Sequence, residues 1–588
     1  MKKTLSIILA LCLTGTMITS CNYSAANSSA NGNSGSEISN RSAGLETIDN
    51  SKWKYNSDDN VYYQIGITYC SNPADSNYEN LAIFVPGDYM NASSNNDGTY
   101  TCTINDSSTV NGYTALTAPI VMPINTPGYS AQAALTDYTD VSAYTGAGFV
   151  YVHAGCRGRD SGAPAGVTDL KAAIRYIRYS DSSVPGDAES IFTFGMSGGG
   201  AQSAIVGATG DSDLYTPYLE QIGALTGYSD AVLGSMCWCP ITNLDTADGA
   251  YEWMMGTTRS GLSEEQQKIS DKLAEAYASY INSAGIKDPS GNVLTLNSSS
   301  EGIYQAGTYY DYMKTVIETS LNNFLSDTTF PYDASSSSQG GMGGPGGMPG
   351  GGEGRQRPEG GNREGHSFED KDNITRNSSS NGITISGTYN TAQEYIDALN
   401  ANGQWVTYDA STNTASITSI KDFVAAFKSA SKNLGAFDQL DAGQGENTLF
   451  GYGDGNGAHF DSYLSSILKE IGSEYASNYQ TDLEKKDSVG NTVDVRLKMY
   501  TPLYYLLESS EGYNTSKVAQ YWRIRTGITQ GDCALSTEMN LALALEDNSA
   551  VKSVDFETVW GAGHTMAERT GNSTENYINW VNECMKNR

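Results

Sequence analysis

Basic residues are scarce in this 588-residue chain. Lysine and arginine number 35, against 66 aspartate and glutamate residues, which gives a formal net charge of −31. A surface with this much negative charge repels phosphate backbones and anionic membranes. We therefore expect no nucleic-acid partner and no direct binding to a lipid surface. The simplest interpretation of the charge is a well-solvated extracellular surface.

Long apolar runs are also missing after the first twenty residues. The chain begins with Met1, Lys2 and Lys3, continues with an apolar run over residues 5–17, and reaches small residues just before Cys21. Such a run is too short to span a bilayer comfortably and is typical of a secretory signal. We predict a signal peptide of the bacterial lipoprotein type over residues 1–20, with Cys21 lipidated and the protein anchored at the cell surface. The alternative is an ordinary signal with an incidental cysteine.

Cysteines are few and do not form a recognisable framework. Once Cys12 leaves with the signal and Cys21 carries lipid, seven remain, and an odd number prevents complete pairing within one chain. Cys237 and Cys239 lack the four-ligand spacing of a zinc site. We therefore interpret the two as residues of a core strand, and the serine chemistry considered below needs neither a metal nor an organic cofactor.

Two kinds of segment divide the chain. Short apolar runs alternate with helical patterns over residues 45–255 and again over 501–588, which predicts an α/β core with a mostly parallel sheet. Residues 256–500 have a charged, helical pattern and are expected to form a large, mostly helical lid insertion. The spacer 21–44 and the Gly-rich tract 335–367 lack the apolar residues that a core needs, so we expect both to be disordered.

The segment "IFTFGMSGGGAQS" carries the strongest chemical signal. Gly195, Ser197 and Gly199 fit the G-x-S-x-G pattern of a nucleophile elbow, in which a serine lies on a strained turn between a strand and a helix. An apolar strand pattern precedes the serine, and small residues suited to a helix follow it. This context favours Ser197 as a nucleophile over a serine in an ordinary glycine-rich turn.

A nucleophilic serine needs a base, and the chain contains only four histidines. His366 lies in the Gly-rich tract, His459 in the insertion and His153 at the end of a strand. His564 lies on a glycine-containing loop after the last strand pattern, where the chain order Ser, acid, His of α/β-hydrolases places the base. We therefore choose His564 as the base.

The acid and the oxyanion donors follow from the same fold. Asp532 is the only carboxylate between the preceding strand pattern and the helix that contains Glu538, so we expect it to orient His564, although it could instead cap that helix. The backbone N–H of Gly198 and one from the loop around Gly128 are the expected oxyanion donors.

Several stretches together resemble the bacterial tannases, acyl hydrolases of the α/β-hydrolase fold that release gallate from galloyl esters. They include "AGCRGRDS", "PGDAESIFTFGMSGGGAQSAIVGATG", "CPITNLDTADGAYEW", "LGAFDQLDAGQGENTLFG", "YWRIRTG" and the terminal "GAGH". The resemblance implies that Lys432 and Glu446, in the lid, bind the galloyl hydroxyls. Their chemistry fits, because vicinal phenols suit a carboxylate acceptor together with a cation.

One departure from the family pattern concerns the acid loop. Family members usually carry two aspartates two residues apart, the first in the triad and the second on the substrate, whereas this chain has Gln530 and then Asp532. Either Asp532 serves the triad or the triad lacks its acid. Cys156 and Cys533 border the loops expected near the site, and a bridge between them is one option.

The resemblance and the motif together predict a serine carboxylic-ester hydrolase that acts on small phenolic acyl esters, galloyl esters above all. A feruloyl or cinnamoyl esterase is the nearest alternative. A serine peptidase and a non-catalytic surface protein that binds polyphenols or glycans also fit the fold. The sequence does not predict an oligomeric state.

Overall fold

The computed structural model describes residues 45–334, 383 and 385–588. The predicted signal peptide, the lipidation site Cys21, the spacer 21–44 and the Gly-rich tract 335–367 lie outside the described residues. No helix in the described part of the chain is both long enough and apolar enough to cross a bilayer.

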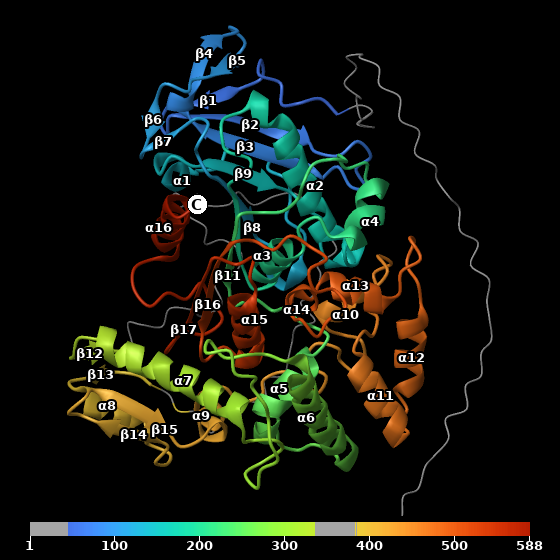
Figure 1. Ribbon diagram of the computed structural model, residues 1–588, viewed down its shortest axis with the longest axis vertical. Coiled ribbons are helices and arrows are strands. Elements are labelled where there is room, and N and C mark those ends of the chain that lie inside the picture. Colours follow the sequence, from blue (N-terminus) through green and yellow to red (C-terminus); the bar gives the residue numbers. More distant parts are fainter. Residues whose placement is uncertain (1–44, 335–382, 384) are drawn as a thin grey trace, which may run out of the picture. The chain divides into compact units, whose positions relative to one another are not determined.

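A nine-stranded sheet forms the centre of the molecule (Figure 1). Its strands, in spatial order, are β1 (Lys54–Asn56), β2 (Val61–Thr68), β3 (Asn80–Pro86), β9 (Val150–Ala154), β8 (Ile120–Ile124), β10 (Ile191–Met196), β11 (Gly234–Trp238), β16 (Tyr521–Gly527) and β17 (Ser553–Val559). Pairing is antiparallel from β1 to β9 and parallel from β9 to β17. The carboxyl ends of β10, β16 and β17 therefore lie at the same edge of the sheet.

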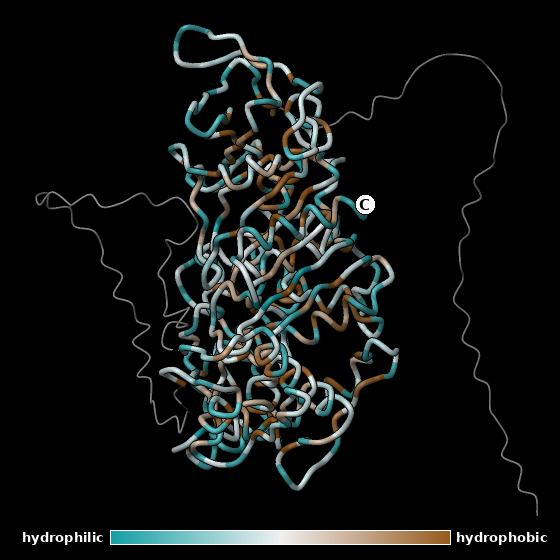
Figure 2. The backbone as a smooth tube through the Cα atoms, turned by 90° about the vertical axis from the view of Figure 1, so that its left-hand side faces the viewer, coloured by the Kyte–Doolittle hydropathy of each residue, from teal (hydrophilic) through white to brown (hydrophobic). Residues whose placement is uncertain are grey.

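Both faces of the sheet are buried, which explains the short continuous apolar runs in the sequence. Phe192 and Phe194 of β10 face a cluster with Tyr577 and Trp580 of α16 (Ser573–Lys586). Ile191 belongs to the opposite cluster, which contains apolar residues of α2 (Ala165–Ser180), α3 (Gly198–Ala208) and α15 (Leu535–Asp547). In Figure 2 many of the hydrophilic segments lie in peripheral loops, and apolar ones run through the interior.

The segment between β11 and β16 adds no strand to this sheet within the described residues. Its helices are α5 (Ala247–Met255), α6 (Glu264–Ala284), α7 (Thr308–Asp327), α8 (Ala392–Leu399), α9 (Ile420–Phe427), α10 (Gly445–Phe450), α11 (Ser462–Ile471), α12 (Ala476–Glu484), α13 (Val493–Met499) and α14 (Pro502–Leu506). Two small hairpins accompany them, β12 (Tyr332–Asp333) with β13 (Thr388–Tyr389) and β14 (Val406–Asp409) with β15 (Thr414–Ile417). The predicted α/β-hydrolase fold with a mostly helical insertion is confirmed.

Smaller elements complete the core. They are the hairpins β4 (Met90–Ser94) with β5 (Tyr100–Ile104) and β6 (Thr109–Val110) with β7 (Tyr113–Thr114), and the short helices α1 (Ser142–Gly146) and α4 (Thr216–Gln221).

The seven cysteines of the described residues are all buried free thiols. A bridge between Cys156 and Cys533 is therefore wrong for this structure. The Cys533 thiol is instead held beneath the acid loop, where Gln530 Nε2 lies 2.9 Å away and Glu538 Oε1 3.3 Å away.

Candidate active site

Ser197 lies on a sharp turn between β10 and α3, as the motif predicts. Its backbone has φ 59° and ψ −124°, a strained conformation for a residue other than glycine. The Ser197 N–H donates to Trp238 O on the neighbouring strand, at 2.9 Å. A Cβ atom on Gly199 would lie 2.1 Å from Ile124 O, and one on Gly195 would lie 2.5 Å from the same atom. The turn therefore needs glycine at both positions.

The two expected oxyanion donors lie next to each other. Gly198 is the first residue of α3, and a Cβ atom on it would lie 3.2 Å from Gly128 N. Among the described residues, no acceptor takes a hydrogen bond from Gly128 N or Gly198 N. Gly128 has φ 54°, and its carbonyl accepts from Arg159 Nη1 at 3.1 Å, which fixes the peptide that follows. Arg159 was not singled out in the sequence.

Asp532 and His564 follow β16 and β17, and the fold brings them together. Asp532 Oδ2 lies 3.5 Å from His564 Nδ1, with 46% of the Asp532 side chain and 22% of the His564 side chain exposed. The contact lacks hydrogen-bond geometry and becomes an ion pair only when His564 is protonated, and no hydrogen bond joins His564 to Ser197 in the described part of the chain. Catalytic hydrogen bonds are often long before substrate binds.

Burial lowers the pKa of His564 below its ordinary value of 6.5. The negative charge of Asp532 opposes this shift, and the nearby positive charges of Lys432 and Lys428 add to it. The imidazole is therefore neutral at pH 7, which is the form that can accept a proton from a serine.

Gln530 points away from His564 and shapes the acid loop from within. Its Oε1 accepts from the N–H groups of Asp532 and Cys533 at 2.9 and 3.2 Å, and its Nε2 donates to Glu538 Oε1 at 2.9 Å. Only 2% of the Gln530 residue is exposed. Gln530 thus holds the backbone from which the Asp532 side chain projects.

A lid lysine supports the same loop. Lys428, which follows α9, is buried, and its Nζ donates a hydrogen bond to Gln530 O. Burial raises the pKa of the Glu538 carboxyl, and the Lys428 charge opposes that rise. Sequence reasoning missed Lys428, and it assigned Glu538 only to a helix.

Lys432 and Glu446 both come from the lid and both lack an ionic partner in the described chain. Lys432 Nζ lies 3.9 Å from the centre of the Phe437 ring, and its backbone N–H donates to Tyr251 OH. Glu446 is 7% exposed in the first turn of α10, which packs on the loop that contains Gly128. The Glu446 carboxylate oxygens accept no hydrogen bond within the described residues and are not among the fully buried unpaired atoms, so they are open to solvent and free to accept from a ligand.

The other described histidines have structural contacts. His153 Nε2 lies 2.9 Å from Ala133 O, and His459 Nδ1 contacts Asp438 at 2.7 Å while its ring stacks on Tyr479. His366 lies outside the described residues.

Comparisons with known proteins bear on the fold and on the class of enzyme. The BD-FAE family model, which represents a feruloyl esterase-like domain, matches residues 113–280, a range that includes Gly128 and Ser197. No curated protein matches the chain.

Solved tannases share the fold over most of their length. The tannase of Fusobacterium nucleatum is 26% identical, with a TM-score of 0.63, 89% of this chain covered and 95% of that one. The tannin acyl hydrolase of Lactobacillus plantarum is 24% identical, with a TM-score of 0.62 and coverages of 89% and 94%. A tannin acyl hydrolase in complex with ethyl gallate has a TM-score of 0.60 at 24% identity and the same coverages. The chain is therefore a carboxylic ester hydrolase with the α/β-hydrolase fold, similar to the bacterial tannases and related to the feruloyl esterases.

Proposed function

We propose that the protein hydrolyses galloyl esters by serine acyl-enzyme chemistry. Ser197 Oγ attacks the ester carbonyl while His564 takes the serine proton, and the carbonyl oxygen becomes an oxyanion facing the N–H groups of Gly198 and Gly128. The imidazolium then gives its proton to the leaving alkoxide, and the alcohol departs. Water, deprotonated by His564, then attacks the acyl carbon, the bond to Ser197 Oγ breaks, and the imidazolium returns its proton to Ser197 as the acid is released.

Asp532 is the orienting acid in this proposal. It is the carboxylate that lies beside His564 Nδ1, and it stabilises the imidazolium that forms in each step. With nearly half of its side chain exposed, Asp532 also has room to accept from a substrate hydroxyl. One aspartate then covers the roles that two residues share in the family pattern.

The observation that carries the galloyl assignment is that two lid residues of opposite charge, Lys432 and Glu446, each lack an ionic partner in the described residues. Glu446 accepts no hydrogen bond and Lys432 has no carboxylate partner within the described residues, and Lys432 lies near enough to His564 to lower its pKa. Vicinal phenolic hydroxyls would donate to Glu446 while the Lys432 cation favours their partial ionisation. The similarity to a tannin acyl hydrolase that was solved in complex with ethyl gallate supports this choice.

A feruloyl esterase is the second candidate, and the BD-FAE match favours it. A ferulate ring carries one hydroxyl and one methoxy group, so it would use Glu446 as an acceptor but would make less use of Lys432. The two candidates share the mechanism and differ only in the acyl group.

The deciding experiment compares methyl gallate, methyl ferulate and p-nitrophenyl acetate as substrates of the protein without its signal peptide. We expect the highest kcat/KM with methyl gallate and no turnover by Ser197→Ala. Ser182→Ala, a change at an exposed serine, is the matched control and should keep full activity. A preference for ferulate would favour the second candidate, and no turnover of any ester would favour a binding protein.

We further propose that the protein is exported and held at the bacterial cell surface through lipid on Cys21. The motif that supports this lies outside the described residues. Incorporation of a labelled fatty acid into the full-length protein, lost in Cys21→Ser, would support the anchor. Incorporation that persists in Cys21→Ser would contradict it.

A further inference from the structure

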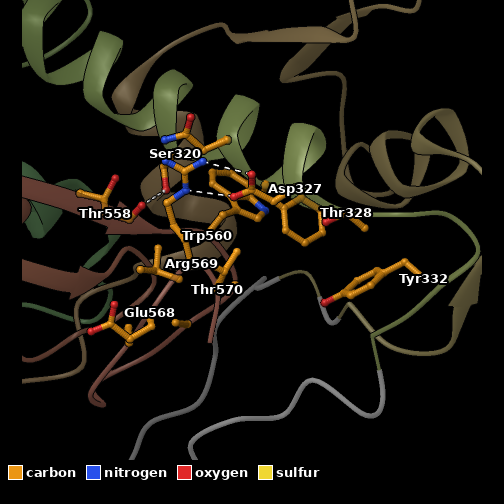
Figure 3. A pocket seen from close by; sticks show the side chains of 15 residues that line it. Ser320, Asp327, Thr328, Tyr332, Thr558, Trp560, Glu568, Arg569 and Thr570 are labelled. Carbon is orange, nitrogen blue, oxygen red and sulfur yellow. Dashed lines mark hydrogen bonds and ion pairs between the residues drawn. The ribbon is translucent and has the colours of Figure 1, made fainter. Parts of the chain in front are cut away.

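A cavity of about 350 Å³ lies between α7, the end of β17 and the loop over residues 560–570 (Figure 3). None of Ser197, Asp532 and His564 lines it. Gly561 and Ala562 do line it, and the Ala562 carbonyl accepts from the backbone and the hydroxyl of Thr529 in the acid loop. The cavity is therefore separate from the nucleophile but shares a wall with the loop that carries the base.

The charged groups of the cavity already neutralise one another. Arg569 donates to both oxygens of Asp327, at 2.9 and 3.1 Å, and to Glu557 at 2.6 Å, and Figure 3 shows the pair with Asp327 directly. Glu568 accepts from two nitrogens of Arg523, at 2.7 and 2.6 Å. Among the lining residues no charge is left without an opposite partner, so the cavity has little to attract a phosphate or a carboxylate.

Uncharged polar groups remain available around these ion pairs. The side chains of Asn323, Thr328 and Thr570 make no hydrogen bond within the described residues, although all three residues line the cavity. An amide supplies both a donor and an acceptor, and each hydroxyl can serve as either. Such a set suits a ligand with several neutral hydroxyl groups.

Aromatic side chains supply the apolar part of the wall. Phe324, Tyr332 and Trp560 line the cavity, and Figure 3 shows Tyr332 and Trp560 on different sides of it. The Phe324 and Tyr332 rings meet edge to face, with centroids 5.3 Å apart. Apolar ring faces combined with a few placed polar groups are typical of sites for small neutral ligands.

We propose that this cavity binds a neutral polyhydroxylated ring, namely a pyranose unit. The C–H face of the sugar would pack on the aromatic side chains. Its hydroxyls would form hydrogen bonds with the side chains of Asn323 and Thr570 and with the polar atoms of Arg569 and Asp327. The volume suits one such ring. The site does not depend on the proposed acyl specificity, because a sugar without an ester can be tested alone.

The test is titration of the wild-type protein with methyl glucopyranoside, followed by saturation-transfer NMR. We expect saturable binding with a Kd of about 1 mM, as ligands of this size commonly show. Asn323→Leu and Thr570→Val, which lie on different elements, should each weaken binding about tenfold. Thr319→Val, at an exposed position of α7 outside the cavity, is the matched control and should bind as wild type does.

Two sources of the sugar are distinguished by kinetics. If the sugar belongs to the substrate, Thr570→Val raises KM for a galloyl glucose and leaves KM for methyl gallate unchanged. If it belongs to a separate glycan, Thr570→Val weakens binding of an oligosaccharide and changes neither KM. Failure of the glucoside to bind, an unchanged Kd in both cavity variants, or binding of pyrogallol without the glucoside would overturn the proposal.

Discussion

Asp532→Asn tests the assignment of the triad acid. The substitution keeps the size of the side chain and removes the charge that lies 3.5 Å from His564 Nδ1. At this separation the attraction for an imidazolium ranges from about 1 kcal/mol in bulk water to about 5 kcal/mol at the effective dielectric constant near a protein surface. Because 46% of the Asp532 side chain is exposed, solvent screens the pair, and we expect about 2 kcal/mol.

That energy corresponds to a roughly 30-fold fall in kcat. The loss is smaller than the roughly 10⁴-fold loss known for a fully buried triad aspartate, because this carboxylate lies at the surface. The acidic limb of the pH profile of kcat/KM should also move to lower pH, since the Asp532 charge raises the pKa of His564.

Steady-state kinetics with two substrates separate the possible roles of Asp532. p-Nitrophenyl acetate has no phenolic hydroxyl for Asp532 to bind, so a role on His564 predicts similar losses of kcat with this ester and with methyl gallate. Asp58→Asn, an exposed control, should have no effect. Unchanged hydrolysis of p-nitrophenyl acetate by Asp532→Asn would refute the triad role and leave only substrate binding.

Three further predictions concern the lid and the acid loop. Glu446→Gln should raise KM for methyl gallate at least tenfold and leave p-nitrophenyl acetate hydrolysis unchanged; equal losses with both esters would instead indicate damage to the catalytic groups. The acidic limb of the wild-type profile should have an apparent pKa below 6.5, and Lys432→Met should move it upward by removing a nearby positive charge, whereas a downward move would contradict this electrostatic reasoning. Gln530→Glu places a second carboxylate against buried Glu538 and removes a hydrogen bond worth about 1.5–3 kcal/mol. Urea unfolding at pH 8 should therefore show a free energy of unfolding that is lower by about this amount. Since a carboxyl pair of this kind has a raised pKa in the folded state, the loss should shrink towards pH 5, and a pH-independent loss would count against a shared proton.

Local signals account for what the sequence could predict. The elbow around Ser197 is specified by adjacent glycines, and Asp532 and His564 follow strand patterns whose order along the chain fixes their place at one edge of the sheet. These features depend on neighbours in sequence or on the rules of parallel sheets. The same reasoning placed Gln530 where an aspartate was expected but could not show which way its side chain points.

The residues that were missed depend on contacts between distant segments. Lys428 meets Gln530 across 102 residues of sequence, and Arg159 meets the Gly128 carbonyl across 31 residues. Nothing in the sequence next to either cation marks its partner. A bridge from Cys533 to Cys156 likewise stayed an option in the sequence, because the burial of Cys533 against Glu538 is visible only once the loop is folded.

The hydrogen bond from Lys428 to the acid loop has a consequence for engineering the protein. In the proposed function the insertion supplies Lys432 and Glu446 for the acyl ring, and its Lys428 also holds the loop from which Asp532 projects. Exchange of the insertion for that of another esterase would therefore change specificity and remove a support of the catalytic machinery together. A chimaera should recover turnover only if it retains a lysine at position 428, so acyl preference and turnover cannot be altered as independent modules.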